Sequence, residues 1–366
     1  MTTRVALCLP GGGAMGALYQ IGALAALEDA IEGFDANSFD LYVGSSSGAS
    51  LSAALAAGVQ VQRLYRAFLD PADVYFGLER KHLVRIDLSE WRRTLITAWS
   101  ALRHASGSLL LREPKALPKA VWEELDRLYD SLPAGIFTLE GYERFLEDFF
   151  VRRSVPNTFS AMPRALRILA HDLDSGRSVC FGDSEHITAP VTRACIASMA
   201  IPPFFSPVRI GDRHYLNPGV GQISHLDTAA DAGASVLVVV NSMVPISVDS
   251  VPTGHGHRDS LRDKGMMWVL NQSIRIGMQR LLDESVQRIT QSGEVSVLRL
   301  EASPADGVLF MYNPASFESR RRMLEHAYRT TRAELSQRFL RRDETLQRAG
   351  FVPKVNTRSM PPSVPG

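Results

Sequence analysis

The chain has 366 residues, of which 45% are hydrophobic and 22% are charged, and its formal net charge is +1. This composition is typical of a globular protein that is large enough to bury a core without metals or disulfides. The near-neutral charge gives no field that would attract nucleic acid, so we expect no nucleic-acid partner. The three cysteines have no paired spacing, which argues against a disulfide framework and against a zinc site.

Two further features bear on where the protein works. The sequence contains no run of about 18 apolar residues, the length that a membrane-spanning helix needs. The opening MTTRVALCLPGGG lacks the charged region and the apolar length of a signal peptide. We therefore expect a cytoplasmic location.

The first 60 residues predict two strand–loop–helix units. An apolar run at 4–9 is closed by Pro10 and three glycines, and apolar residues at helical spacing follow over 16–30. A second strand at 40–44 runs into SSSGAS and then into an alanine-rich helix. Repeated units of this kind indicate an α/β fold in which a parallel-rich sheet is sandwiched between helices.

The rest of the chain is expected to complete one domain over residues 1–345. Amphipathic segments such as EWRRTLITAWSALRH follow one another over about 60–150 with no strand between them, which indicates a helical insertion. A long charged helix is predicted over about 316–342, and the four prolines in 351–366 predict a disordered tail. Further strands are expected at 165–173, 177–182, 206–210, 214–218, 235–241 and 295–300, and further helices at 192–200 and 265–288.

A glycine-rich loop, GGGAMG at residues 11–16, lies between the first predicted strand and the first helix. Glycines allow a sharp turn and leave backbone N–H groups free at a helix N-terminus, where negative charge is stabilised. Two chemistries use such a place. A dinucleotide site binds a pyrophosphate there, and an acyl hydrolase binds the oxyanion of a tetrahedral intermediate.

A second glycine motif separates these two hypotheses. Gly44 and Gly48 flank Ser46 in the pattern G-x-S-x-G, between a strand and a helix, as a nucleophile elbow requires. A dinucleotide site would instead need an acidic residue at the C-terminal end of the second strand, whereas Asp40 lies at its beginning. The pair of motifs therefore favours an acyl hydrolase over a nucleotide-binding module.

The sequence resembles the patatin-like phospholipases. The resemblance rests on segments that occur in the order of that family and cover about residues 4–245, and they are LCLPGGGAMGALYQIGAL, VGSSSGAS, LAHDLDSGRSVCFG, RACIASMAIPPFFSPV and YLNPGVGQ. The segment NPASFESRRRMLEHAYRTT is similar to a C-terminal helix of some bacterial members. The resemblance implies hydrolysis of acyl esters of lipids by a Ser–Asp dyad, without histidine, metal or cofactor.

Carried over by position, the resemblance makes Ser46 the nucleophile. It places the oxyanion hole at the loop glycines, which are Gly11, Gly12, Gly13 and Gly16. Family loops often carry Arg or Lys where this chain has Met15. The catalytic aspartate of the family opens an Asp-Gly-Gly or Asp-Gly-Ala turn, and the matching residue here is Asn217.

Asn217 is a serious departure, because a neutral amide has no basic lone pair to take the serine proton. Three explanations remain open. The chain is a degenerate relative that binds acyl lipid without turnover, or His225, Asp227 or His214 supplies the base, or the asparagine is foreign to the natural sequence. Of these, retained or residual acyl hydrolysis is the preferred hypothesis.

Three tryptophans of the insertion, Trp91, Trp99 and Trp122, lie on stripes with other apolar residues. Most such stripes are core, and the alternative is a peripheral contact with a membrane or lipid surface. The expected partners are therefore an acyl lipid or ester substrate and, as this alternative, a lipid surface.

Overall fold

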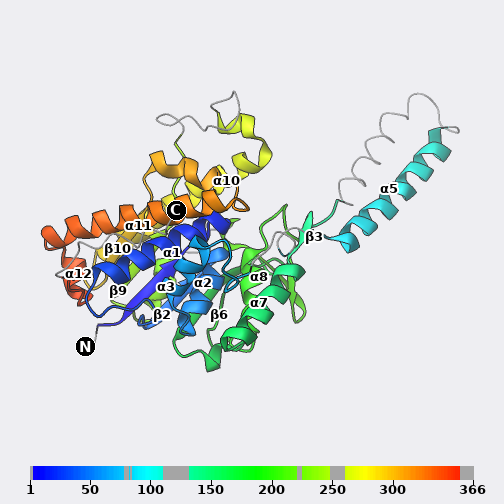
Figure 1. Ribbon diagram of the computed structural model, residues 1–366. Coiled ribbons are helices and arrows are strands. Elements are labelled where there is room, and N and C mark those ends of the chain that lie inside the picture. Colours follow the sequence, from blue (N-terminus) through cyan, green and yellow to red (C-terminus); the bar gives the residue numbers. More distant parts are fainter. Residues whose placement is uncertain are drawn as a thin grey trace.

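The computed structural model describes residues 3–77, 82, 85–109, 132–220, 225–247 and 260–354. A mixed sheet with strand order β10-β9-β1-β2-β5-β8-β7 lies between layers of helices, and β6 pairs with β5 (Figure 1). Its strands are β1 (Val5–Leu9), β2 (Leu41–Gly44), β5 (Ala165–Asp172), β6 (Arg177–Phe181), β7 (Val208–Ile210), β8 (Arg213–Leu216), β9 (Val236–Asn241) and β10 (Ser296–Glu301).

The sheet is parallel through β10, β9, β1, β2 and β5, and β6, β7 and β8 pair antiparallel at the other end. The predicted parallel-rich sheet is therefore confirmed, and each of its predicted strands lies within two residues of an observed one. Leu9 pairs with Gly44, so the carboxyl ends of β1 and β2 lie side by side.

Alternating side chains of the strands build two cores. Leu7 and Leu9 point into the larger core, which contains α1 and α2, whereas Ala6 and Cys8 point into a smaller core with α9 and α10. The helices of the larger core's side are α1 (Gly13–Ala30), α2 (Ser47–Ala56), α3 (Val61–Leu69), α7 (Glu140–Arg153), α8 (Val191–Met199) and α11 (Phe317–Leu340). On the opposite face lie α9 (His225–Asp231) and α10 (Met266–Thr290).

Helix α1 is buried on nearly all sides because it lies between the sheet and α11 (Figure 1). The helix contacts α11 at Gly22, where a Cβ would lie 2.6 Å from the carbonyl oxygen of Leu324. The predicted C-terminal helix is confirmed as α11, and its N-cap is Ser316, whose hydroxyl accepts the N–H of Ser319. Short connecting helices are η1 (Phe159–Ala161), η2 (Pro218–Val220), η3 (Leu261–Lys264), η4 (Pro304–Met311) and α12 (Glu344–Arg348).

The insertion differs from the expectation of helices alone. It contains an antiparallel pair of strands, β3 (Arg85–Ile86) and β4 (Phe137–Thr138), from which α5 (Leu88–Leu109) projects away from the sheet (Figure 1). Strands of two residues carry no periodic pattern, so they cannot be recognised in the sequence. Residues 110–131 of the predicted insertion, which include Trp122, lie outside the described residues.

The described residues extend four positions into the expected tail. The amide of Glu32 donates to Val352, Lys354 donates to Ala30, and the ring of Phe351 packs edge-on against Phe34 at 5.1 Å. An aromatic side chain with an apolar site to fill outweighs the local proline signal. Residues 355–366 lie outside the described residues.

Candidate active site

Ser46 lies in a tight bend between β2, which ends at Gly44, and α2, which begins at Ser47. Its backbone angles are φ 52° and ψ −129°, a conformation that L-residues rarely adopt and that stores strain at functional sites. The neighbours Ser45 and Ser47 are buried, whereas Ser46 is only half-buried. Of the three consecutive serines, the bend therefore leaves only Ser46 partly accessible to solvent.

The glycines that flank Ser46 allow this bend by close approach. A Cβ on Gly44 would lie 2.6 Å from the carbonyl oxygen of Gly48. A Cβ on Gly48 would overlap the carbonyl oxygen of Leu9 on the neighbouring strand. Strand, elbow and helix therefore fit together only if both positions lack a side chain.

The glycine loop lies directly against the serine. A Cβ on Gly11 would lie 2.7 Å from Cβ of Ser46 and 3.3 Å from its Oγ. The contact follows from the sheet, because β1 and β2 are parallel neighbours whose ends meet at Leu9 and Gly44. The two motifs that the sequence singled out are thus adjacent in space.

The four loop glycines have different hydrogen bonds. Gly11 N–H donates to Ser45 Oγ at 3.2 Å, and Gly16 N–H donates to the carbonyl of Gly12 at 3.1 Å. For Gly12 and Gly13, no acceptor of the amide lies within the described part of the chain. Of the four amides expected in the oxyanion hole, those of Gly12 and Gly13 remain as candidate donors, since those of Gly11 and Gly16 already have acceptors.

Ser198 on α8 fixes the backbone of Ser46, a contact that sequence reasoning missed. Ser46 N–H donates to Ser198 Oγ at 2.8 Å, and the Ser198 hydroxyl donates to the carbonyl of Leu169 at 2.6 Å. A serine in a run of small helical residues carries no signal of such a role. Only the packing of α8 against β5 brings it there.

Asn217 follows β8 and is buried, with 5% of its surface exposed. Its Nδ2 donates to the carbonyl of Ser198 at 2.6 Å, and its Oδ1 accepts the N–H of Gly219 at 2.8 Å. The side chain therefore uses both its donor and its acceptor as an amide does, and it connects to Ser46 through Ser198. Within the described residues, neither of its polar atoms is hydrogen-bonded to the serine hydroxyl.

The three alternative bases lie elsewhere. His225 Nε2 lies 2.9 Å from Oγ of Ser45, the residue before Ser46. Burial lowers the pKa of His225 to about 4. Asp227 forms an ion pair with Arg288. His214 lies on β8, between β5 and β7, and its Nδ1 is 3.2 Å from Asp174.

A second support reaches the loop from the carboxyl end of β9. The Ser242 hydroxyl donates to the carbonyl of Gly11 at 2.6 Å. The guanidinium of Arg275, on α10, in turn donates to the carbonyls of Ser242 and Val244 at 3.0 and 2.9 Å. Arg275 is 1% exposed, and burial lowers its pKa to about 10.

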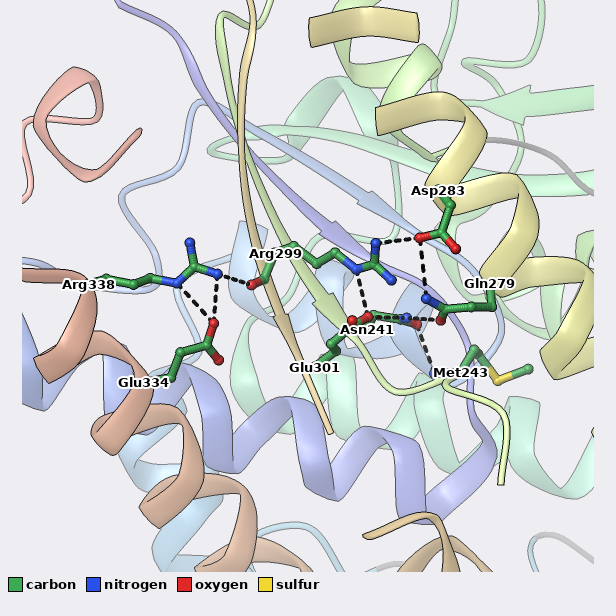
Figure 2. A network of polar contacts seen from close by, with 8 residues as sticks. All are labelled: Asn241, Met243, Gln279, Asp283, Arg299, Glu301, Glu334 and Arg338. Carbon is green, nitrogen blue, oxygen red and sulfur yellow. Dashed lines mark hydrogen bonds and ion pairs between the residues drawn. The ribbon is translucent and has the colours of Figure 1, made fainter. Parts of the chain in front are cut away.

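Figure 2 shows the polar network that anchors this segment. Asn241, the last residue of β9, donates to Gln279 and Glu301 at 3.0 Å each and accepts the amide of Met243 at 2.9 Å. Arg299 joins Glu301 at 2.7 Å and Asp283 at 2.5 Å. These contacts connect β9, β10 and α10 at Asn241, the residue before Ser242.

Comparison with known proteins supplies the family. None of the curated proteins matches the chain. Among solved structures, VipD from Legionella pneumophila is 12% identical, with a TM-score of 0.38, and the alignment covers 92% of this chain and 67% of VipD. The type III effector ExoU is 18% identical, with a TM-score of 0.35, and the alignment covers 93% of this chain. The chain spans 54% of the length of ExoU, and likenesses this weak carry no conclusion about function.

The sequence model of the patatin-like phospholipases matches residues 7–248. That range is well over half of the chain, and it contains the glycine loop, the serine elbow and the turn at Asn217. The resemblance inferred from the sequence is thereby confirmed, and the chain belongs to the patatin-like phospholipase family.

Proposed function

We propose that the protein hydrolyses acyl esters of lipids with Ser46 as the nucleophile. The observation that carries this proposal is the strained, half-exposed Ser46 against a glycine loop whose Gly12 and Gly13 amides have no acceptor in the described residues. Ser46 Oγ would attack the ester carbonyl, and these amides would stabilise the resulting oxyanion. Collapse of the intermediate releases the alcohol and leaves an acyl-serine, which water hydrolyses to the fatty acid.

The proposal predicts slow turnover. General base catalysis is typically worth about 10² to 10⁴ in rate, and Asn217 cannot supply it. The serine proton must then pass to water or to the leaving alkoxide, because the described residues place no titratable side chain on Ser46 Oγ.

Labelling with a fluorophosphonate and hydrolysis of a panel of short and long acyl esters test the nucleophile. We expect wild type to be labelled at one site, and Ser46→Ala to lose both labelling and hydrolysis. Ser47→Ala is the matched control, because the buried Ser47 hydroxyl has no hydrogen-bond partner within the described residues. Hydrolysis that persists in Ser46→Ala would refute the proposal.

Asn217→Asp tests the missing base. The new carboxylate would face the carbonyl of Ser198, to which Asn217 now donates, so we expect a stability loss of about 1 to 3 kcal/mol. Relief of that repulsion favours turning the carboxylate toward the serine, and we expect ester hydrolysis to rise. If wild type is already fast and Asn217→Asp changes nothing, the base lies elsewhere.

A second candidate function is binding of an acyl lipid without turnover. It is favoured by the two hydrogen bonds of Asn217, one donated by Nδ2 and one accepted by Oδ1, because these suit a neutral amide rather than a base. This alternative predicts saturable binding of a fluorescent phospholipid to wild type with neither labelling of Ser46 nor release of fatty acid. Stoichiometric labelling by the fluorophosphonate would exclude it.

A lipid-surface contact belongs to the same proposal, and we assign it to α5. Its side chains Leu88, Leu95, Ile96 and Trp99 are 75%, 65%, 60% and 67% exposed, and their spacing places them on one face of the helix. The helix carries three arginines against one glutamate, a charge that suits anionic headgroups. It projects from the body (Figure 1).

The strand pair β3–β4, from which α5 projects, is joined to the segment that follows α8. The amides of Ile136 and Phe137 donate to Pro203 and Phe204 at 3.1 and 2.7 Å. A lipid surface held by α5 would thus lie beside the helix that supplies Ser198. No helix of the described residues has both the length and the apolar character that crossing a bilayer requires.

Vesicle sedimentation tests this contact in the Ser46→Ala background, where hydrolysis cannot alter the lipid. We expect binding to phosphatidylglycerol–phosphatidylcholine vesicles and its loss when Leu95 and Trp99 are both changed to Asp. Leu340→Asp is the control, because Leu340 is 77% exposed on α11. Unchanged binding in the double variant, or a change in oligomeric state instead, would reject α5 as the lipid contact.

A further inference from the structure

Ser45, the residue before the nucleophile, forms a buried hydrogen-bonded unit with His225. Ser45 is 3% exposed, and its Oγ accepts the N–H of Gly11 at 3.2 Å and lies 2.9 Å from Nε2 of His225. Gly11 in turn touches Ser46, where a Cβ on the glycine would lie 2.7 Å from the serine Cβ. Three elements, the glycine loop, the elbow and α9, therefore meet at one hydroxyl.

The direction of the Ser45–His225 hydrogen bond follows from donor counting. Gly11 N–H already donates to Ser45 Oγ, so the hydroxyl hydrogen of Ser45 needs an acceptor. Within the described residues, Nε2 of His225 is the acceptor in reach. The imidazole therefore carries its proton on Nδ1 and receives the Ser45 hydroxyl at Nε2.

His225 is a firm anchor for this unit. It is 5% exposed, it begins α9, and its carbonyl accepts the thiol of Cys8 on β1 at 3.6 Å. The next residue, Leu226, is buried in the core with Cys8. The backbone that carries the imidazole is thus held by the sheet rather than by the glycine loop.

The other side of Gly11 is held independently. Its carbonyl accepts the Ser242 hydroxyl at 2.6 Å. In a trans peptide the C=O and the following N–H point in opposite directions, so the N–H of Gly12 faces away from Ser242. Ser45 fixes the peptide before Gly11, and Ser242 fixes the peptide after it.

We infer that His225 and Ser45 are positioning residues, which hold Gly11 against Ser46 so that the Gly12 and Gly13 amides are already aimed when an oxyanion forms. This inference rests on the proposed hydrolase function. It also assigns Ser45 a supporting role, although Ser45 is the serine that contacts a histidine. A preorganised donor needs no reorganisation during the reaction, and this is the source of its catalytic value.

The amide of Gly11 can be observed directly. The sequence contains three Pro–Gly pairs, at 10–11, 218–219 and 365–366, so protein labelled with ¹³C′-proline and ¹⁵N-glycine gives only three correlated amide signals. Gly219 is an internal control, because its N–H donates to Asn217. We expect Ser45→Ala to speed hydrogen exchange of the Gly11 amide about tenfold or more, as expected for loss of one hydrogen bond, and to leave Gly219 unchanged.

Variants of His225 separate positioning from packing. His225→Leu introduces an apolar side chain of similar size that cannot accept the hydrogen bond from Ser45. His225→Gln places an oxygen near the position of Nε2, where it can accept that hydrogen bond. We expect His225→Leu to lower kcat about tenfold or more with KM within about twofold, since the loss falls on the transition state. We expect His225→Gln to restore most of kcat. We also expect kcat of the double variant His225→Leu/Ser45→Ala to be no lower than that of Ser45→Ala alone.

Cys8→Ala is the control for a purely structural role, because it disturbs the packing under His225 and leaves the imidazole intact. We expect it to keep kcat. If His225→Leu and His225→Gln are equally impaired, or if kcat is unchanged in Ser45→Ala, the inference is wrong while the hydrolase proposal stands. If no variant including wild type hydrolyses esters but Gly11 exchange still depends on Ser45 and His225, the hydrolase proposal fails and the contact network stands.

Discussion

At the scale of single residues, the bend at Ser46 depends on two flanking glycines, positions that have no side chain. Gly44 and Gly48 do not have the positive φ that makes glycine necessary at other turns, whereas the non-glycine Ser46 between them does. What excludes a side chain at Gly44 and Gly48 is contact, with the α2 backbone in one case and with Leu9 of β1 in the other. The strain of the bend is thus carried by the serine, and the glycines provide the space.

Gly48→Ala tests this division. The added methyl would overlap the carbonyl oxygen of Leu9, so β1 and α2 would have to separate. We expect a stability loss of about 2 to 4 kcal/mol in urea denaturation, in the range for overpacking and strain. Gly77→Ala is the matched control, since its nearest contact would be an ordinary 3.6 Å, and an equal loss in both variants would contradict the argument.

His225 predicts a dependence of stability on pH. Burial lowers its folded pKa from 6.5 to about 4, so between these values the unfolded chain binds more protons and stability falls as the pH falls. Relative to His225→Gln, which cannot titrate there, we expect wild type to lose about 2 to 3 kcal/mol between about pH 7 and pH 4.5.

The comparison with His225→Gln is needed because other groups titrate in the same range. Burial raises the pKa of Glu28 to about 7, so its contribution has the opposite sign and is lost as the pH rises. Glu28 is present in both proteins and cancels in the difference. Denaturant titrations at both pH values measure the effect, and parallel stability curves would show that His225 is not buried as a neutral imidazole.

At the scale of elements, α10 supports the site through one buried cation. Arg275 donates to two carbonyls that follow β9 and to Asn271 at 2.8 Å, and its guanidinium lies 4.7 Å from the ring centre of Phe310. None of these contacts is a carboxylate. The charge is therefore stabilised by peptide dipoles and an aromatic face, at the point where the chain leaves the sheet toward Ser242.

Arg275→Met tests this support. The change removes the donors from two carbonyls, and we expect a stability loss of about 2 to 4 kcal/mol because buried acceptors are left unpaired. Arg280→Met on the same helix is the control, since its side chain is 81% exposed in an ion pair with Glu284, a type worth little. Calorimetric melting of both variants measures the difference, and a loss confined to Arg280→Met would reverse the assignment.

At the scale of the whole molecule, the last described residues are part of the fold. Residues 351–354 run along the segment between α1 and β2. The bridge between Ile31 and Pro353 makes this contact a short antiparallel pairing. These residues therefore pack against the C-terminal end of α1, the end opposite to the glycine loop.

Phe351→Ala tests the contact between residues 351–354 and the segment after α1. The ring is half-buried against Phe34, and we expect its removal to cost about 2 kcal/mol, below the value for a fully buried phenylalanine. Val352→Ala is the control, because Val352 is 53% exposed. Urea denaturation measures the loss, and ester hydrolysis should persist in both variants because neither side chain touches the site. Equal stability of the two variants would show that residues 351–354 contribute nothing.

The sequence by itself determined the strands of the main sheet, the long C-terminal helix, the family and the serine that we propose as nucleophile. These depend on local signals, since apolar runs make buried strands and paired glycines permit two sharp bends that consecutive strands bring together. The sequence also shows an amide at residue 217, where the resemblance to the family implies an acid.

Only the tertiary structure decided what surrounds Ser46. Ser198, Ser242, His225 and Arg275 come from separate parts of the chain, and none stands in a pattern that marks it. The glycine amides also looked alike in sequence, yet those of Gly11 and Gly16 have acceptors, whereas those of Gly12 and Gly13 have none among the described residues. Hydrogen-bond partners depend on which elements pack side by side, and this packing is set by contacts between residues as far apart as 231 positions, beyond the reach of local periodicity.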